Sequence, residues 1–350
     1  AAEHGVLPPS IEVVELPDGY HLSTFLKQRK RVSAQLLSLM QASTYNLFPI
    51  GGWIGDWGVT AALTAQSHGI PHAIWFDRVE SQVVLGSTDD SLTGKLKAQI
   101  RSKVMSFNER RLLRRADLAL LHGRTVFERF APVSKNPHLV EDIHLTEADH
   151  ISDDALESKL TTAADGAFRI VYAGRATAMK GPLDWVDVIA GLASRGIDVR
   201  AEWLGDGDEL AAMKQLASER GIEDRIDFKG FVSDRSTVLQ SLRNAHCLLF
   251  CHLTDESPRI LIEALHSGTP LIGYQDPFAR SLVEEQAAGH LVARGDKAAL
   301  TDTLTALAQD RQKLQGLIER AAQSALHLTR EQVFRHRSEI VKSELPQNRT

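Results

Sequence analysis

The chain of 350 residues has few cysteines and no long apolar run. Its two cysteines, Cys247 and Cys251, lie four apart in the segment HCLLFCH, where we expect a buried, reduced pair rather than a disulfide. No apolar stretch approaches the roughly 20 residues that a membrane-spanning helix needs, and no signal-peptide pattern is visible at Ala1. The sequence therefore predicts an ordinary globular protein of the cytoplasm.

Excess positive charge and metal-ligand spacings are also missing. The net charge of -5 argues against a general nucleic-acid-binding protein, which is normally basic. The 14 histidines and two cysteines show no His-x-x-x-His or Cys-x-x-Cys spacing that is persuasive of a metal site. Asp206-Gly207-Asp208 has the form of a metal-binding Asp-x-Asp pair, but its position in WLGDGDEL favours a strand-end turn. No strand is followed by a clean Gly-x-Gly-x-x-Gly with an acid roughly 20 residues later, which argues against an NAD oxidoreductase.

The length is comfortable for two hydrophobic cores, and strand and helix patterns alternate in both halves of the chain. This alternation predicts parallel sheets joined by right-handed crossovers. We expect one domain over 1–164, a second over 165–328 and a terminal helical segment over 329–350. Regular signals fade between 133 and 167, so we place the linker at 162–166.

Individual elements can be placed from hydrophobic periodicity. In the first half we expect a strand at 8–16 and helices at 26–40, 59–67 and 95–116. In the second half the expected strands lie in FRIVYAGR, VRAEWLGDGDEL, IDFKGFV, HCLLFCH, PLIGYQ and GHLV.

The most informative stretch is 253–273, LTDESPRILIEALHSGTPLIG. Ser257 is a good N-cap and Pro258 suits the first helical position, so we expect a helix from about Pro258. The free N–H groups and the positive dipole end of such a helix favour a phosphate. Asp255 precedes the helix and Glu263 lies within it, and a carboxylate can accept two hydrogen bonds from a sugar diol. Together these features suggest a sugar-nucleotide site.

This stretch resembles the acidic signature of retaining, family-4-type glycosyltransferases (glycosyl transferases group 1), which usually reads Glu, seven residues, Glu-Ala. Here the pattern is Asp255, seven residues, Glu263-Ala264; alternatively Glu256 takes the first role with a loop one residue shorter. The resemblance covers about 168–307. It implies an α/β protein of the GT-B fold, in which two Rossmann-like, doubly wound parallel-sheet domains face each other across a cleft. In this fold the terminal helix, here 330–341, commonly crosses back to the first domain.

The resemblance also implies a set of donor-site residues in the second domain. Arg175 and Lys180 follow the first strand of that domain in GRATAMKG, and two cations there can neutralise the phosphates of a departing nucleoside diphosphate. Glu263 would hold the ribose, and Asp255 or Glu256 a hydroxyl of the donor sugar. The other expected substrate-binding positions are Gly174, Gly205, Val232 (through backbone groups around the base), Ser257, Pro258, Arg259 and Ile260.

Two segments of the first domain are further candidates. The loop GGWIGDWG either satisfies turns or lines the cleft, with Gly52 and Asp56 as candidates and Asp56 either capping a helix or touching the acceptor. Asp77 closes the strand HAIWFDRVE at a place where similar family members often carry a histidine. We take Asp77 as a catalytic candidate with Arg78 and Glu80 as its expected ion partners.

The function that this resemblance implies is a retaining, metal-independent hexosyltransferase, for which we expect no cofactor. It would move a sugar from a UDP-sugar or GDP-sugar to a glycan, lipid-linked or small-molecule acceptor in bacterial polysaccharide or glycoconjugate synthesis. No enzymic nucleophile is evident, so we expect a front-face displacement guided by the diphosphate. The alternatives are a GT-B epimerase, a sugar-phosphate glycosyltransferase, and a catalytically silent partner subunit that binds sugar nucleotides.

The segment 95–116, KLKAQIRSKVMSFNERRLLRRA, is crowded with lysine and arginine. One interpretation is a solvated helix face. The other is a surface that makes peripheral contact with anionic lipid or a diphosphate-linked acceptor at the inner face of the membrane.

Overall fold

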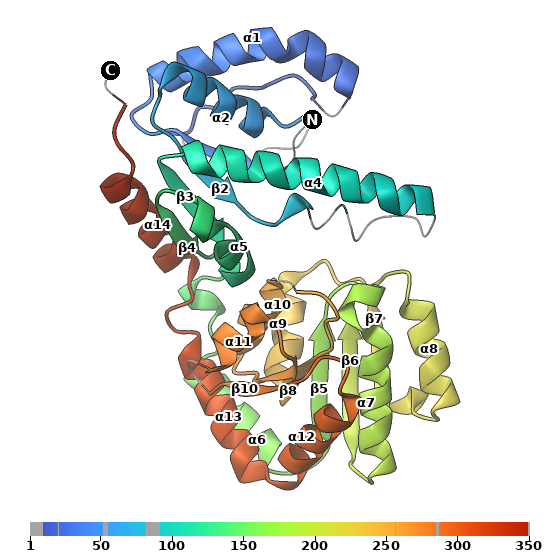
Figure 1. Ribbon diagram of the computed structural model, residues 1–350. Coiled ribbons are helices and arrows are strands. Elements are labelled where there is room, and N and C mark those ends of the chain that lie inside the picture. The colour runs from blue at the N-terminus through green and yellow to red at the C-terminus, as the bar shows by residue number, and fades with distance from the viewer. Residues whose placement is uncertain are drawn as a thin grey trace. The chain divides into compact units, whose positions relative to one another are not determined.

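The computed structural model describes residues 10–19, 21–51, 55–81, 84, 92–255, 257–284 and 287–348. The chain divides into two compact units. The first comprises the chain up to His122, Val126–Val140 and the chain from Ser338 onward, and the second comprises Gly123–Thr125 and Glu141–Arg337. Each unit is built on a parallel sheet with helices around it (Figure 1).

The first unit holds a four-stranded parallel sheet in the order β1-β2-β3-β4. Its strands are β1 (Leu47–Ile50), β2 (Ala73–Phe76), β3 (Leu118–His122) and β4 (Pro137–Val140). The helices that accompany it in sequence are α1 (Leu22–Gln41), α2 (Trp57–His68), α4 (Leu92–Arg115), α5 (Gly123–Phe130) and the 3-10 turn η1 (Ala131–Val133).

The strand expected at 8–16 is absent from its described part: residues 11–19 have no regular structure. The alternation in IEVVEL arises from side chains that stay in water, since Ile11 and Val13 are about half exposed (51% and 49%). Alternating apolar residues predict a strand only when one face is buried, and no partner strand pairs with this segment.

Helix α14 (Arg330–Glu344) begins in the second unit and ends in the first. Its Ile340, with Leu345 just beyond it, belongs to a buried cluster formed with the first-unit sheet residues Ala73, Leu118, Leu120 and Val140. The end of the chain is therefore part of the core of the first unit.

The second unit holds a six-stranded parallel sheet in the order β10-β9-β8-β5-β6-β7. Its strands are β5 (Phe168–Ala173), β6 (Val199–Leu204), β7 (Ile226–Gly230), β8 (Cys247–Phe250), β9 (Leu271–Tyr274) and β10 (Gly289–Val292). All six expected strands are confirmed. The sheet grows from β5 to β7 on one side and then returns to add β8 to β10 on the other, so the strand order reverses between β5 and β8.

Two groups of helices pack around this sheet (Figure 1). The first group is α7 (Pro182–Ser194), α8 (Leu210–Glu219) and α12 (Lys297–Gln309). The second is α6 (Asp153–Ala164), α9 (Arg235–Asn244), α10 (Arg259–His266) and α13 (Arg311–Ser324). The remaining elements are α11 (Pro277–Glu284), η2 (Glu147–Asp149), η3 (Ala178–Lys180) and η4 (Glu223–Arg225).

Residues 162–166, expected as a linker, lie instead at the end of α6 and in the turn before β5. The chain changes unit earlier, between Val140 and Glu141. Cys247 and Cys251 are free and buried, as expected. In the described part of the chain no helix is both long and apolar enough to traverse a bilayer.

Candidate functional site

The loops that follow β5 and β8 pack against each other at the carboxyl ends of these strands. Gly181 has a φ of +60°, and a Cβ added there would lie 2.0 Å from the carbonyl oxygen of Cys251. The backbone N–H of Leu253 donates to the carbonyl oxygen of Met179 at 2.8 Å. In parallel sheets, ligands bind where the strand order reverses. The structure thus brings the loop of Arg175 and Lys180 to the loop that leads into α10, at this reversal.

The loop after β6 lies at the same carboxyl-terminal edge of the sheet. A Cβ added to Gly205 would lie 1.9 Å from the carbonyl oxygen of Gly174, so only glycine permits this approach. The N–H of Ala176 donates to the carbonyl oxygen of Asp206 at 2.9 Å, and the Asp206 carboxylate accepts from the N–H of Gly207 at 2.8 Å. This is the geometry of a strand-end turn. Among the described residues, no group of three or more His, Cys, Asp or Glu side chains could hold a metal ion.

Helix α10 begins at Arg259, one residue later than expected. Pro258 is the N-cap, with an extended backbone (φ -76°, ψ 127°), and none of the side chains that the structure describes caps the helix. The expectation that Ser257 caps it was wrong, because the extended Pro258 separates Ser257 from the first turn; a Cβ on Gly123 would meet the Ser257 hydroxyl at 2.7 Å. The first-turn amides of α10 accordingly carry no side-chain cap, which suits an anionic ligand.

The first acid of the signature has a partner that the sequence did not reveal. Asp255 forms an ion pair with Arg294, which follows the carboxyl end of β10. Both side chains are partly exposed, Asp255 at 45% and Arg294 at 39%. The alternative first acid, Glu256, lies outside the described residues. Sequence alone could not have found Arg294, because the pairing depends on β8, β9 and β10 being neighbours in the sheet.

The second acid, Glu263, is half-buried on α10. Burial raises its pKa above the usual glutamate value, while the positive charges of Arg235 and Arg259 oppose this shift. The Arg259 guanidinium is itself paired with the Asp142 carboxylate at 3.2 Å. Ile260 is 8% exposed and belongs to the core, so only its backbone can face a ligand.

A buried histidine lies next to the loop that carries Arg175 and Lys180, which we call the cation loop. The Tyr172 hydroxyl is 2.8 Å from Nε2 of His252, and both side chains are about 1% exposed. Burial and, to a lesser extent, the nearby positive charge of Lys180 lower the pKa of His252 to about 3. A Cβ on Gly174 would lie 2.9 Å from the Tyr172 ring. The Tyr172–His252 pair therefore supports the loop that carries Arg175 without adding positive charge beside Lys180 at neutral pH.

The pKa of His252 predicts an acid-dependent loss of stability. Because the folded-state pKa lies below the usual histidine value of about 6.5, the unfolded chain binds more protons than the folded chain as the pH falls through the window from about 6.5 to about 3. Between pH 6.5 and 4.5 this group should lower the unfolding free energy by about 2 kcal/mol, and His252→Gln should remove that share. Urea denaturation across this pH range measures it. The exposed His327→Gln is the control, and a pH dependence of His252→Gln equal to that of wild type would contradict the assignment.

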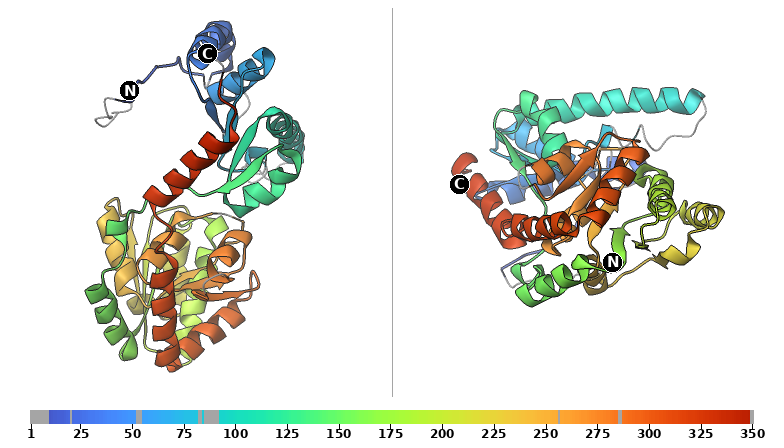
Figure 2. Two further views of the ribbon diagram at one scale, coloured as in Figure 1. Left: turned by 90° about the vertical axis from the view of Figure 1, so that its left-hand side faces the viewer. Right: turned by 90° about the horizontal axis from the view of Figure 1, so that it is seen from below.

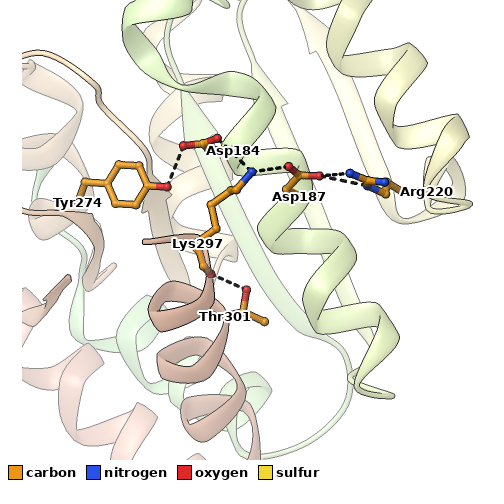
Figure 3. A network of polar contacts seen from close by, with 6 residues as sticks. All are labelled: Asp184, Asp187, Arg220, Tyr274, Lys297 and Thr301. Carbon is orange, nitrogen blue, oxygen red and sulfur yellow. Dashed lines mark hydrogen bonds and ion pairs between the residues drawn. The ribbon is translucent and has the colours of Figure 1, made fainter. Parts of the chain in front are cut away.

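A polar network fixes the helix that follows the cation loop (Figure 3). Near the start of α7, Asp184 accepts from the Tyr274 hydroxyl of β9 at 2.9 Å. Lys297 of α12 lies 3.6 Å from Asp184 and 2.8 Å from Asp187. Asp187 also pairs with Arg220, and these contacts hold its pKa below the usual aspartate value even though burial opposes the shift. The network thus ties α7 to α12, to the carboxyl end of β9 and to the end of α8.

The candidates of the first unit have local roles. Asp56 is the N-cap of α2, accepting from the N–H groups of Gly58 at 2.7 Å and Val59 at 3.2 Å, so the capping alternative is the observed one. Asp77 accepts from the Trp75 indole.

The expected ion pairs of Asp77 are wrong: Arg78 pairs with Glu80, and the carboxylates of Asp77 and Glu80 carry the same charge and cannot form an ion pair. Gly52 lies outside the described residues. Val232, half-buried after β7, packs against the core of the second unit.

Comparison with known proteins agrees with this geometry. Residues 155–324 match the family described as "Glycosyl transferases group 1". A phosphatidyl-myo-inositol mannosyltransferase of Mycobacterium leprae is 34% identical over 130 residues, which are 37% of this chain and 33% of that protein. An N-acetyl-alpha-D-glucosaminyl L-malate synthase of Bacillus anthracis is 28% identical over 140 residues, 39% of this chain and 36% of that one. The matched region thus spans about a third of the length of these relatives.

A solved structure resembles nearly the whole chain. Anabaena Alr3699/HepE, crystallised with UDP, superposes with a TM-score of 0.67 at 16% identity, covering 89% of this chain and 82% of the other. At this identity the likeness shows the fold, which is GT-B. The family match over residues 155–324 and the fold together make this chain similar to the GT-B glycosyltransferases of group 1.

Proposed function

We propose that this protein transfers a sugar from a nucleoside-diphosphate sugar to an acceptor. The proposal is supported by three features that lie together where the strand order of the second unit reverses. They are the loop of Arg175 and Lys180, the start of α10 without a side-chain cap, and the acidic loop of Asp255. Cations and free amides suit a diphosphate, and carboxylates suit sugar hydroxyls. The first unit is proposed to bind the acceptor and the second the donor.

Each site residue has a role in this proposal. Arg175, Lys180 and the first-turn amides of α10 would bind the diphosphate, with Gly174 and Gly205 allowing close backbone approach. Glu263 would accept from the ribose hydroxyls. Asp255 or Glu256 would accept from a hydroxyl of the donor sugar.

The negative charge that develops on the departing diphosphate determines which groups would catalyse the transfer. As the bond between the anomeric carbon and the diphosphate oxygen breaks, negative charge grows on the phosphate, and fixed cations stabilise it more in the transition state than in the ground state. We propose that the acceptor attacks from the same face as the leaving diphosphate, which takes the acceptor proton, so that the anomeric configuration is retained. No divalent metal is needed in this scheme, and activity should persist in EDTA.

The substrates are proposed at the level of class. The donor is a UDP-hexose or GDP-hexose, in line with the UDP found in the Anabaena protein. The names of the two relatives include a phosphoinositide and malate, so lipid-linked and small polar acceptors both fit, and bacterial polysaccharide or glycoconjugate synthesis is the proposed setting. Helix α4 is proposed as a peripheral contact with anionic lipid.

A donor panel tests this function. Calorimetry with UDP, GDP and their hexose conjugates should show binding of one nucleotide series, and incubation with acceptors should give a glycoside whose anomeric configuration, measured by NMR, matches the donor. Binding without turnover on any acceptor would favour a silent partner subunit. A changed sugar released without an acceptor would favour an epimerase, and no binding of any nucleotide would overturn the proposal.

Arg294 should matter for the sugar and not for the nucleotide. Because Arg294 fixes the Asp255 carboxylate through an ion pair, Arg294→Gln should raise the donor KM about tenfold, the cost of roughly one charge-assisted hydrogen bond. Affinity for the nucleoside diphosphate alone should not change. Arg280→Gln, which removes an exposed pair with Glu284 on α11, is the matched control. Equal losses for donor and free diphosphate would contradict this role.

A further inference from the structure

Helix α4 has an apolar stripe that the fold leaves exposed. Four large apolar side chains on it remain in contact with water: Leu96 (59% exposed), Ile100 (56%), Val104 (37%) and Phe107 (63%). At about 100° per residue they lie within roughly 80° of one another around the helix. The side chains that α4 buries in its own unit lie on the opposite face: Ala98, Met105, Glu109, Leu112 and Leu113. The stripe is therefore not the face that holds α4 in place.

Basic residues border this stripe on both sides. Helix α4 contains eight lysines and arginines and a single acid, whereas the whole chain has a net charge of -5. On the helix, Lys97 and Arg101 fall on one side of the stripe and Lys103 and Arg110 on the other.

The one acid of α4 does not offset these charges at the surface. Glu109 is 5% exposed and accepts hydrogen bonds from the N–H and hydroxyl of Ser81 at 2.9 and 2.8 Å. The exposed surface of α4 thus carries almost only positive charge around an apolar centre.

The position of α4 within its unit leaves this surface accessible. In Figure 1 and in the right-hand view of Figure 2, the N-terminal half of the helix extends beyond the sheet of the first unit. A large exposed apolar strip is unusual on a protein surface unless a protein partner, a ligand or a membrane covers it. A helix with large apolar residues on one face and flanking lysine and arginine is typical of helices that lie in the lipid interface.

We propose that α4 docks on an anionic lipid bilayer. The stripe Leu96–Ile100–Val104–Phe107 enters the boundary between headgroups and acyl chains, and the flanking lysines and arginines pair with lipid phosphates while their methylene stems cover the stripe edges. This gives a physical basis to the peripheral contact included in the proposed function, and it does not depend on which sugar is transferred. The charge of the stripe borders favours lipid over an uncharged protein partner.

Vesicle co-sedimentation of the full chain tests the proposal. Phosphatidylcholine vesicles containing phosphatidylglycerol should bind the protein at least tenfold more strongly than phosphatidylcholine alone, and added salt should weaken the binding. Ile100→Ser with Phe107→Ser should reduce binding about tenfold by removing apolar insertion. Lys97→Gln with Arg101→Gln and Lys103→Gln should do the same by removing charge.

Matched controls separate docking from general effects. Leu326→Ser removes an equally exposed apolar side chain elsewhere, and Lys214→Gln removes a surface charge on α8; both should bind vesicles like wild type. Absence of wild-type binding to anionic vesicles, or unchanged binding by both α4 variants, would overturn the proposal. So would a stripe variant that turns a dimer into a monomer in sedimentation without vesicles. Donor binding by calorimetry should be equal in all these proteins, so a failed donor assay would count against the transferase function and not against docking.

Discussion

Lys180→Ala and Arg175→Ala should each lower kcat by about 10²- to 10³-fold, the usual cost of removing one group that stabilises charge in a transition state. Both residues lie in the loop after β5, which rests on the loop before α10, so their charges are held where a diphosphate would depart. Arg175 is exposed and Lys180 half-buried, so the unfolding free energy should change little.

Steady-state kinetics together with urea denaturation measure both effects in the same proteins. Lys214→Ala on α8 is the control for removing a lysine elsewhere in the unit and should retain wild-type turnover. Turnover within a few-fold of wild type in both site variants would remove the two cations from the mechanism.

Gly181→Ala should destabilise the protein by at least about 4 kcal/mol, in the range reserved for strong steric conflict. The added methyl group would lie 2.0 Å from the Cys251 carbonyl oxygen, and backbone atoms must move to relieve it. Since Gly181 directly follows Lys180 and caps α7, this movement should also displace the cation loop and abolish most turnover.

Gly221→Ala is a closely matched control. Gly221 has a φ of +65°, nearly that of Gly181 at +60°, but a Cβ added there meets no atom within 4 Å. Gly221→Ala should therefore lower the unfolding free energy only by the backbone penalty of about 1–2 kcal/mol, and turnover should not change. The difference between the two substitutions isolates the contact between the loops after β5 and β8. Equal losses of stability would show that these loops do not pack as described.

Local patterns predicted the second unit well. Each strand from β5 to β10 is a short apolar run bounded by turn residues, and such runs are visible without knowing their neighbours. The placement of Gly205 at a strand-end turn was also predicted, from the resemblance of WLGDGDEL to the strand-end turn of group 1 glycosyltransferases, although the close approach to Gly174 that requires a glycine is a tertiary contact. The acidic signature and the two cations were recognisable by their resemblance to the same family, whose model matches residues 155–324.

Features that depend on tertiary contacts could not be predicted. Arg294 meets Asp255 only because β10 lies two strands from β8, and Tyr172 meets His252 only because β5 and β8 are adjacent. The exact start of α10 depended on the backbone angle of Pro258, which the residue type leaves open between helical and extended values.

Because of helix α14, the first unit is built from segments that are not contiguous in sequence. The polypeptide passes from the first unit to the second after Val140 and returns after Arg337. Recombination that exchanges a single contiguous segment for a new amino-terminal half would leave Ile340 and Leu345 behind with the wrong partner, and the recipient would lack two side chains of its hydrophobic interior. Chimeras of this protein should thus be soluble only when the tail is transplanted together with the amino-terminal portion.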